Sequence, residues 1–420
     1  MRLCRKALCA ILAMLVLFSG CVFKKSTEET VCPPIQIGVI LAENDSGIGQ
    51  EQKDGYEFAL QEINEAGGIF GCPIELSYQD EGKDADIETA QVAVLDLADE
   101  GVVAILGATS SDATMRTAAI ASYFKIPLVI PAEIGDEVTQ RSNQWIFRLN
   151  TANISYSNVA FNMIKSELGT IANVAILFER TAYGESAAVS AATSAMERGL
   201  EVVGYEGYSS AAADYSAIIE HVELSQPDAF YIISSDATQA QNLLTAIEDQ
   251  YLDGKIIIGH GSGFAGRDFL YNGNNDLNDG TENIMMVMPW SKDMPWHGIE
   301  KFCFEFDAYA GYPAVSHNVE AYVALQVVRE ALEEVVQNNQ VDWMVELEVE
   351  EFIMGFREAL AQALRDFRGS DHETVLGPVE FGASGQSSQE AILVQVIEGQ
   401  LYTIYPPAYA VHDPVYIKGW

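Results

Sequence analysis

The segment from residue 35 to residue 80 constrains the fold most, because it alternates between strand and helix patterns. Ile35–Leu41 is short, mostly apolar and rich in isoleucine, which is typical of a buried strand. Apolar side chains then recur at helical spacing over 52–65, which predicts an amphipathic helix. The helix is expected to end near Gly67, because glycine adopts the left-handed conformation of a C-terminal cap at the least cost. Residues 74–78 are predicted to form a second strand. These elements form a βαβ unit, which requires parallel strands joined by a right-handed crossover.

The same alternation continues through most of the chain. Further strands are expected at 102–106, 128–130, 174–178, 201–205, 229–233 and 255–258, with helices at 86–99, 113–124, 184–198, 214–223 and 238–250. Because the series restarts after Arg148, we predict an α/β fold with two doubly wound parallel sheets, each covered by helices on both faces. The tail departs from this pattern, with two longer helices expected at 318–332 and 344–367 and strands at 377–381, 391–397 and 401–405.

The sequence pattern of the first βαβ unit resembles that of a known family. The resemblance is carried by Asp54, Ala59, Glu62, Ile63, Asn64, Gly67 and Gly71. In these residues the chain resembles the type I periplasmic solute-binding proteins, specifically the branched-chain amino acid binding family of ABC transporters. The resemblance implies two lobes joined by a hinge of three crossing segments, expected near 148–153, 288–290 and 371–378.

Three crossings would make each lobe discontinuous in sequence. The first lobe is expected to comprise 35–150 and 290–372, and the second lobe 151–288 and 376–420. A chain of 420 residues is long enough for two such cores.

The first twenty residues are predicted to be a signal peptide. Three basic residues precede an apolar run over 7–18, which is too short to span a bilayer comfortably. Ser19, Gly20 and Cys21 resemble a bacterial lipoprotein cleavage site, so Cys21 would become the lipidated N-terminus, followed by a linker over 21–34. The alternative is an ordinary signal peptide with an unmodified cysteine. Either interpretation predicts an extracytoplasmic protein, membrane-anchored only if Cys21 carries lipid.

The net charge excludes one class of partner. The chain has 23 Lys and Arg against 61 Asp and Glu, a formal net charge of −38. A field of this sign repels nucleic acid and does not hold the protein on anionic lipid.

Two of the remaining cysteines are placed for a disulfide. Cys32 precedes the first strand and Cys72 precedes the second. Strands paired in parallel through a βαβ unit start at the same sheet edge, so a Cys32–Cys72 disulfide is geometrically plausible in an oxidising compartment. Cys303 has no evident partner in the sequence.

Ligands of doubly wound sheets bind outside the carboxyl ends of the strands, and polar residues follow the strands of the first lobe there. Ser110 and Ser111 stand at the start of a predicted helix, where free backbone N–H groups favour an anion. The resemblance makes Ser111 the carboxylate-binding serine, although Ser111 or Asp112 could equally cap the helix. The resemblance also places Ala132, Glu133 and Ile134 at the ligand. Ile134 lacks the hydroxyl usual there, and Glu133 could instead face solvent.

The second lobe offers a matching set after its own strands. The resemblance makes Tyr183 the tyrosine that closes over the ligand, a role that suits a rigid aromatic ring with a polar tip. Other candidates follow later strands: Ser235, Asp236, His260 and Gly261. In the amino acid binders an acid that pairs with the ligand's ammonium stands at the position of Gly261. Asp236, and after it Glu133, is the expected replacement if the ligand is an amino acid.

The sequence shows no catalytic, metal or cofactor pattern. The six histidines lack metal-type spacing, and no nucleophile is assembled with a base. The glycines at 261, 263 and 266 match a dinucleotide fingerprint only formally, because no long helix follows them. We therefore predict no enzyme but a solute-binding protein that delivers a small polar ligand to an ABC permease. The alternative is a sensory module of the same fold that signals to a receptor. The sequence is compatible with an amino acid, an amide or a small carboxylate as the ligand.

Overall fold

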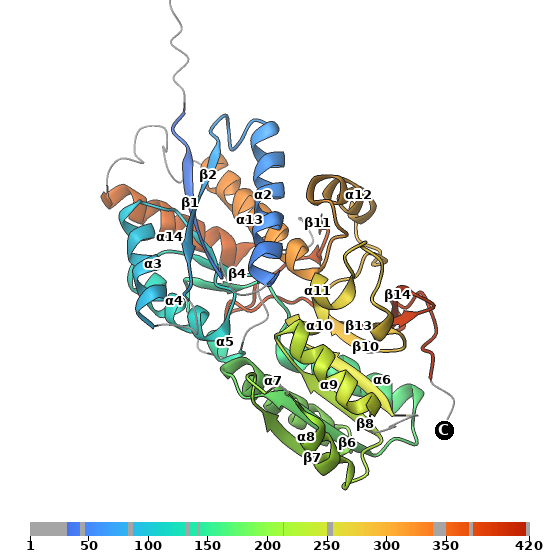
Figure 1. Cartoon of the computed structure of the whole chain (residues 1–420). Helices are drawn as coiled ribbons and strands as arrows, with labels where there is room; N and C mark the ends of the chain where they lie inside the picture. The colour runs from blue at the N-terminus through green and yellow to red at the C-terminus, as the bar shows by residue number, and fades with distance from the viewer. Residues whose placement is uncertain are drawn as a thin grey trace, which may run out of the picture. The chain divides into compact units, whose positions relative to one another are not determined.

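Two separate sheets organise the chain, in agreement with the predicted fold class (Figure 1). The computed structural model describes residues 32–42, 47–82, 87–131, 135–140, 143–212, 214–249, 255–338, 350–368 and 373–416. The predictions for the signal peptide, Cys21, Ala132, Glu133 and Ile134 lie outside these residues.

The first sheet has five parallel strands in the order β2-β1-β3-β4-β5. Their bounds are β1 Ile35–Leu41, β2 Ile74–Asp80, β3 Ile105–Gly107, β4 Leu128–Ile130 and β5 Ile146–Arg148. Ile35 of β1 lies opposite Ile74 of β2, which confirms the parallel βαβ unit. Four helices connect these strands: α2 Gly47–Glu65, α3 Ile87–Asp99, α4 Ser111–Tyr123 and α5 Glu137–Gln140.

Helix α2 shows why the first unit folds as predicted. Its buried side chains include Tyr56, Ala59 and Ile63, the apolar stripe seen in the sequence. In the last turn of the helix, the side-chain amide of Asn64 bonds both the backbone N and the backbone O of Ile74, each at 2.9 Å. This pair of bonds fixes the end of the helix to the start of the next strand.

The second sheet has seven strands in the order β14-β13-β10-β9-β8-β6-β7. Their bounds are β6 Asn173–Glu179, β7 Glu201–Tyr208, β8 Ala229–Ile233, β9 Ile256–His260, β10 Met285–Met288, β13 Ile392–Ile397 and β14 Gln400–Tyr405. Strands β6 to β10 are parallel, but β13 pairs antiparallel with β10 and β14 pairs antiparallel with β13. The predicted parallel series is therefore confirmed for β6 to β10, and the tail, which was expected to depart from it, adds an antiparallel hairpin to the edge of the same sheet.

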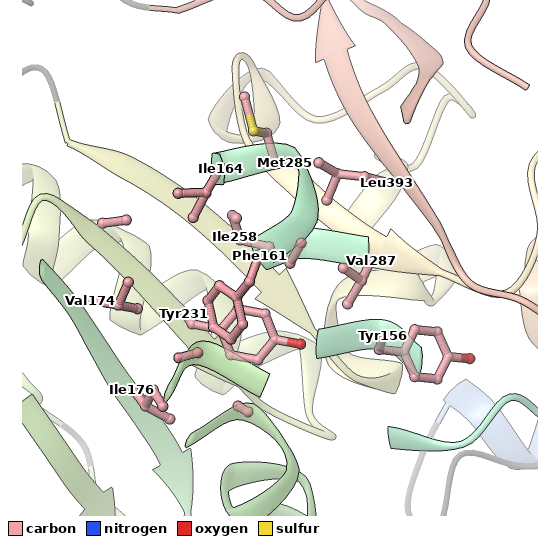
Figure 2. Packing of buried hydrophobic residues seen from close by; sticks show 14 of the residues in the cluster. Tyr156, Phe161, Ile164, Val174, Ile176, Tyr231, Ile258, Met285, Val287 and Leu393 are labelled. Carbon is pink, nitrogen blue, oxygen red and sulfur yellow. The ribbon is translucent and has the colours of Figure 1, made fainter. Parts of the chain in front are cut away.

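Helices of the second lobe pack on this sheet. Their bounds are α6 Asn153–Glu167, α7 Ala182–Glu197, α8 Ser216–Glu223, α9 Ala237–Asp249, α10 Ser262–Ala265 and α11 Arg267–Leu270, with a short 3-10 turn at Asp279–Thr281. Figure 2 shows the core beneath α6, where Phe161 lies beside Tyr231 of β8 with ring centroids 5.1 Å apart. Ile258 of β9 and Met285 of β10 extend this core along the sheet.

Three late helices return to the first lobe. They are α12 Ile299–Ala310, α13 Ser316–Gln337 and α14 Glu350–Asp366, and α13 packs along α2 and against α14. A two-stranded ribbon of β11 Glu373–Thr374 and β12 Gly377–Pro378 follows. The first lobe is thus built from segments that lie on both sides of the second lobe in sequence. The residue numbers of the lobe boundaries stay a prediction.

The chain segments that connect the lobes lie against one another. Gln386 forms a parallel bridge with Arg148, and the backbone N of Arg148 bonds the carbonyl of Gly385 at 2.8 Å. The indole N–H of Trp290 donates to the carbonyl of Val375 at 3.0 Å. The first crossing segment therefore runs beside residues 385–387.

Among the described residues, no helix combines the length and the apolar character that a bilayer crossing requires.

Candidate functional site

The first lobe places its candidate residues where β3 turns into α4. Ser110 is the N-cap of α4, and its hydroxyl accepts a hydrogen bond from the backbone N of Ala113 at 3.4 Å. Ser111 is nearly buried, and its hydroxyl accepts from the backbone N of Gly135 at 2.9 Å. A hydroxyl that accepts one bond still has its own hydrogen to donate. Ser110 also uses its side chain for a hydrogen bond to Glu81, so Ser111 is the stronger candidate to donate to a ligand.

A carboxylate that the sequence analysis missed holds this turn in place. Glu81 follows β2 directly and accepts hydrogen bonds from the backbone N atoms of Thr109 and Ser110, at 2.7 and 3.1 Å. Burial raises the pKa of the Glu81 carboxyl above its ordinary value, and the hydrogen bonds from Ser110 and Thr109 oppose that shift. An acid shortly after a predicted strand was the available signal, because strand ends line the ligand side of such sheets.

The second lobe brings Tyr183, His260 and Gly261 together. Tyr183 lies in the first turn of α7 and is only 4% exposed. A Cβ atom on Gly261 would lie 2.8 Å from the Tyr183 hydroxyl and would clash with the carbonyl of Ser234, and φ of Gly261 is +112°. Only glycine fits this conformation. The absence of an acid at this position is therefore required by the local backbone.

His260 lies in the strand and not in the loop after it, so the expectation that the strand ends at Ile258 is wrong. Strand β9 continues through Gly259 to His260. A side chain at Gly259 would clash with the ring of Phe264, so the glycine lets Phe264 of α10 pack closely on the strand.

Ser235 and Asp236 already have partners within their own lobe. Both the backbone N and the hydroxyl of Ser235 donate to the carboxylate of Glu179, at 2.9 and 2.7 Å. Asp236 accepts from the backbone N of Gln239 at 2.8 Å, so it caps α9. Burial raises the pKa of Glu179, while the bonds from Ser235 and Thr181 oppose the shift. Glu179, the last residue of β6, was not predicted as part of the site.

Asp136 connects the two lobes beside these residues. Its backbone N donates to the hydroxyl of Ser186 on α7 at 3.1 Å. Its carboxylate accepts from Arg148 at 2.6 Å and from the backbone N of Asn153, the first residue of α6, at 3.0 Å. Arg148 is completely buried. Helices α4 and α7 also lie against each other, so the turn at Ser111 and the turn at Tyr183 belong to one region.

The family of the chain follows from its sequence as a whole. The family described as "Periplasmic binding protein" matches residues 34–400. The chain belongs to the periplasmic binding protein family. Leu/Ile/Val-binding protein homolog 8 of Brucella abortus is 26% identical over 375 residues, which cover 86% of this chain and 87% of that protein. Homolog 7 of Brucella suis is 23% identical over 379 residues, covering 87% and 89%. The predicted membership of the branched-chain amino acid group of type I periplasmic binding proteins is confirmed.

Solved structures share the two-lobed fold of this periplasmic binding protein. The substrate binding protein LivJ of Streptococcus pneumoniae, in complex with isoleucine, has a TM-score of 0.72 at 20% identity and covers 89% of this chain and 100% of its own. The solute binding protein of an ABC transporter from R. palustris, in complex with benzoate, has a TM-score of 0.74 at 18% identity and covers 90% of this chain and 98% of its own. The relatives are solute-binding proteins, and those of ABC importers act outside the cytoplasm.

A second connection between the lobes of this periplasmic binding protein lies at the start of α2. The carboxylate of Glu51 accepts a hydrogen bond from the backbone N of Arg267, at the start of α11, at 2.8 Å. Asn318 of α13 donates to the backbone carbonyl of Glu51 at 2.6 Å. The lobes are thus hydrogen bonded to each other through Asp136 and through Glu51.

Proposed function

We propose that this periplasmic binding protein captures a small polar solute between its lobes and presents it to an ABC permease. The observation that carries the proposal is the bond from Asp136 to Ser186, which joins the lobes beside the strand ends that bear Ser111 and Tyr183. A solute that touches both lobes stabilises the form in which they are joined, and the permease would recognise that form.

The proposed ligand-binding residues are those expected from the sequence. In the described part of the chain they are Ser110, Ser111, Tyr183, Ser235, Asp236, His260 and Gly261, to which Ala132, Glu133 and Ile134 are added outside it. The first lobe would hold an anionic or carbonyl group of the solute through Ser111 and the N-terminus of α4. Tyr183 would cover the solute from the second lobe.

The ligands named for related structures support an amino acid or a related small compound. LivJ is described with isoleucine and the protein from R. palustris with benzoate, and both ligands carry one carboxylate. Ser111 and the α4 N-terminus would accept such a group. The side chain or ring of the solute would then determine its fit to the second lobe.

The proposal includes a lipid anchor on Cys21. It rests on the sequence Ser19, Gly20, Cys21 after the apolar run. Mass spectrometry of the membrane fraction should find a mature chain that begins at a diacylated Cys21. A mature chain that begins elsewhere, or that carries a free Cys21, contradicts the anchor without affecting solute binding.

A thermal-shift screen over small metabolites tests the binding function. A ligand present at 100 times its dissociation constant adds about 2.7 kcal/mol to the stability of the folded state. We expect at least one small carboxylate or amide to raise the melting temperature of the mature protein. Turnover of the stabilising compound during incubation would instead indicate an enzyme.

A further inference from the structure

His260 occupies an aromatic enclosure at the end of β9. Its side chain is fully buried. The ring centroids of three tyrosines surround it, at 5.0 Å for Tyr156, 5.5 Å for Tyr231 and 6.0 Å for Tyr183. The tyrosines come from α6, β8 and α7, so His260 lies where the second sheet meets the first turns of two helices.

The two ring nitrogens of His260 have different surroundings. Nδ1 lies 3.0 Å from the hydroxyl of Tyr231, and that hydroxyl lies 3.4 Å from the hydroxyl of Ser157. Nε2 is buried, and no hydrogen-bond partner for it exists among the residues that the structure describes. Because the two nitrogens of an imidazole lie on different sides of the ring, the contact between Nδ1 and Tyr231 leaves Nε2 without that partner. An unpaired buried nitrogen destabilises the folded state unless a further group bonds to it.

The charge around His260 restricts what that further group can be. Burial, and after it the positive charge of Arg148, lower the pKa of His260 to about 3, so the imidazole is neutral at physiological pH. The same positive charge that disfavours a proton on the ring also disfavours an ammonium group beside it. It favours an oxygen atom, which carries partial or full negative charge.

We propose that Nε2 of His260 is a ligand-binding atom that selects solutes by an oxygen, from a hydroxyl, carbonyl or carboxylate group, and against an ammonium group at that position. The inference rests on the proposed function, because the solute must enter between the lobes to reach His260. The neighbouring rings of Tyr156 and Tyr183 leave the new bond shielded from water, which strengthens it. His260 is then a residue that determines specificity.

Paired probes test the inference on the mature protein. The probes are L-leucine with 2-hydroxy-4-methylpentanoate, L-phenylalanine with 3-phenyllactate, and benzoate with 4-hydroxybenzoate. In the first two pairs a hydroxyl replaces the ammonium group on the same skeleton. Calorimetry should find that the wild-type protein binds the hydroxy acid of at least one pair tenfold or more tightly than the amino acid.

Variants of His260 separate a specific role from a structural one. His260→Phe keeps a flat ring but removes Nε2, so the tenfold preference for the hydroxy acid should disappear. His260→Asn offers a side-chain amide instead and should retain part of the preference, and it serves as the second variant if His260→Phe does not fold. His221→Phe is the matched control, because its side chain is 70% exposed, and it should bind like the wild type.

The outcomes distinguish this inference from the function on which it rests. A wild-type protein that binds none of the probes contradicts the inference, and it contradicts the proposed function as well only if the thermal-shift screen finds no stabilising solute. A wild-type protein that prefers the amino acids contradicts the inference alone. The same holds if folded His260→Phe and His260→Asn keep the wild-type preference.

Discussion

The Nδ1 atom of His317 lies 2.6 Å from the Oε2 atom of Glu51, and both side chains are almost completely buried. The other oxygen of that carboxylate accepts the bond from Arg267. His317 belongs to α13 in the first lobe, whereas Arg267 begins α11 in the second. One carboxylate therefore joins two helices of its own lobe and the backbone of the other.

Replacing His317 by leucine should destabilise the protein. The change leaves Oε2 of Glu51 buried without a partner, and such a loss typically costs about 1 to 3 kcal/mol. Urea denaturation should show the corresponding decrease in the free energy of unfolding. His297→Leu, at an exposed position, is the control and should change stability by no more than about 0.5 kcal/mol. Equal stability of the His317 variant and the wild type would contradict the role given to this pair.

Replacing Tyr183 by alanine should weaken solute binding. The expected loss is about 1 to 3 kcal/mol in binding free energy, the scale of one buried aromatic contact or hydrogen bond. Calorimetry with a solute found in the thermal-shift screen measures it. Tyr123→Ala is the control, because Tyr123 is 81% exposed at the end of α4. Wild-type affinity in the Tyr183→Ala protein would mean that the ligand binds elsewhere.

Cys32 and Cys72 should be joined to each other. Each is disulfide-bonded in the structure, whereas Cys303 is free. Non-reducing peptide mapping should recover a Cys32–Cys72 peptide pair. Closure of a loop of about 40 residues is expected to stabilise the protein by roughly 3 to 4 kcal/mol in the chain-entropy model. Two free thiols at these positions would exclude the pairing.

Cys303 should react slowly with alkylating reagents in the same samples. Burial, and after it the charge of Asp307, raise the pKa of its thiol to about 11. Since the thiolate is the reactive form, the alkylation rate at pH 8 should be far below that of a free cysteine and should increase as the pH approaches 11. Rapid alkylation of the native protein at pH 8 would show that the pKa of this thiol is not raised.

Acid should destabilise the fold through His260. Its pKa is about 3 in the folded protein against an ordinary value of 6.5, so only the unfolded chain binds a proton between these values. Stability is then fully present above pH 6.5 and decreases as the pH falls toward 3, by up to about 1.4 kcal/mol per pH unit. His260→Asn should lose this slope. The comparison is made with the wild type, because Glu81 and Glu179 have raised pKa values and oppose the trend equally in both proteins.

Local sequence patterns were sufficient to predict most of the fold. The apolar stripe of α2 and the β-branched run of β1 report burial within a single element, and such periodicity is visible without knowledge of the partner. The antiparallel pairing of β13 with β10 was not visible, since it joins segments more than 100 residues apart. The extent of β9 was missed for another reason. Glycine is unfavourable within a strand, and the packing of Gly259 against the ring of Phe264 becomes visible only in the folded structure.

The candidate site was predictable in its location but not in its internal bonding. The strand ends that carry Ser111 and Tyr183 follow from the order of elements. The partners of these loops do not, because Glu179 reaches Ser235 across 56 residues and Glu81 reaches Thr109 across 28. Asp236 illustrates the limit most directly. Its charge suggested a contact with a ligand's ammonium, which stays a prediction, and the hydrogen bond by which its Oδ1 atom caps α9 was not predicted.

The hairpin of β13 and β14 also determines when the second lobe can be completed. The two strands end at residue 405, yet they form one edge of a sheet whose other strands begin at residue 173. During synthesis the sheet therefore lacks this edge until the chain has been made as far as residue 405. Pairing between such distant segments is also intrinsically slow. The sheet thus still lacks this edge at the stage when the signal peptide predicted for residues 1–20 would direct the chain to the export machinery.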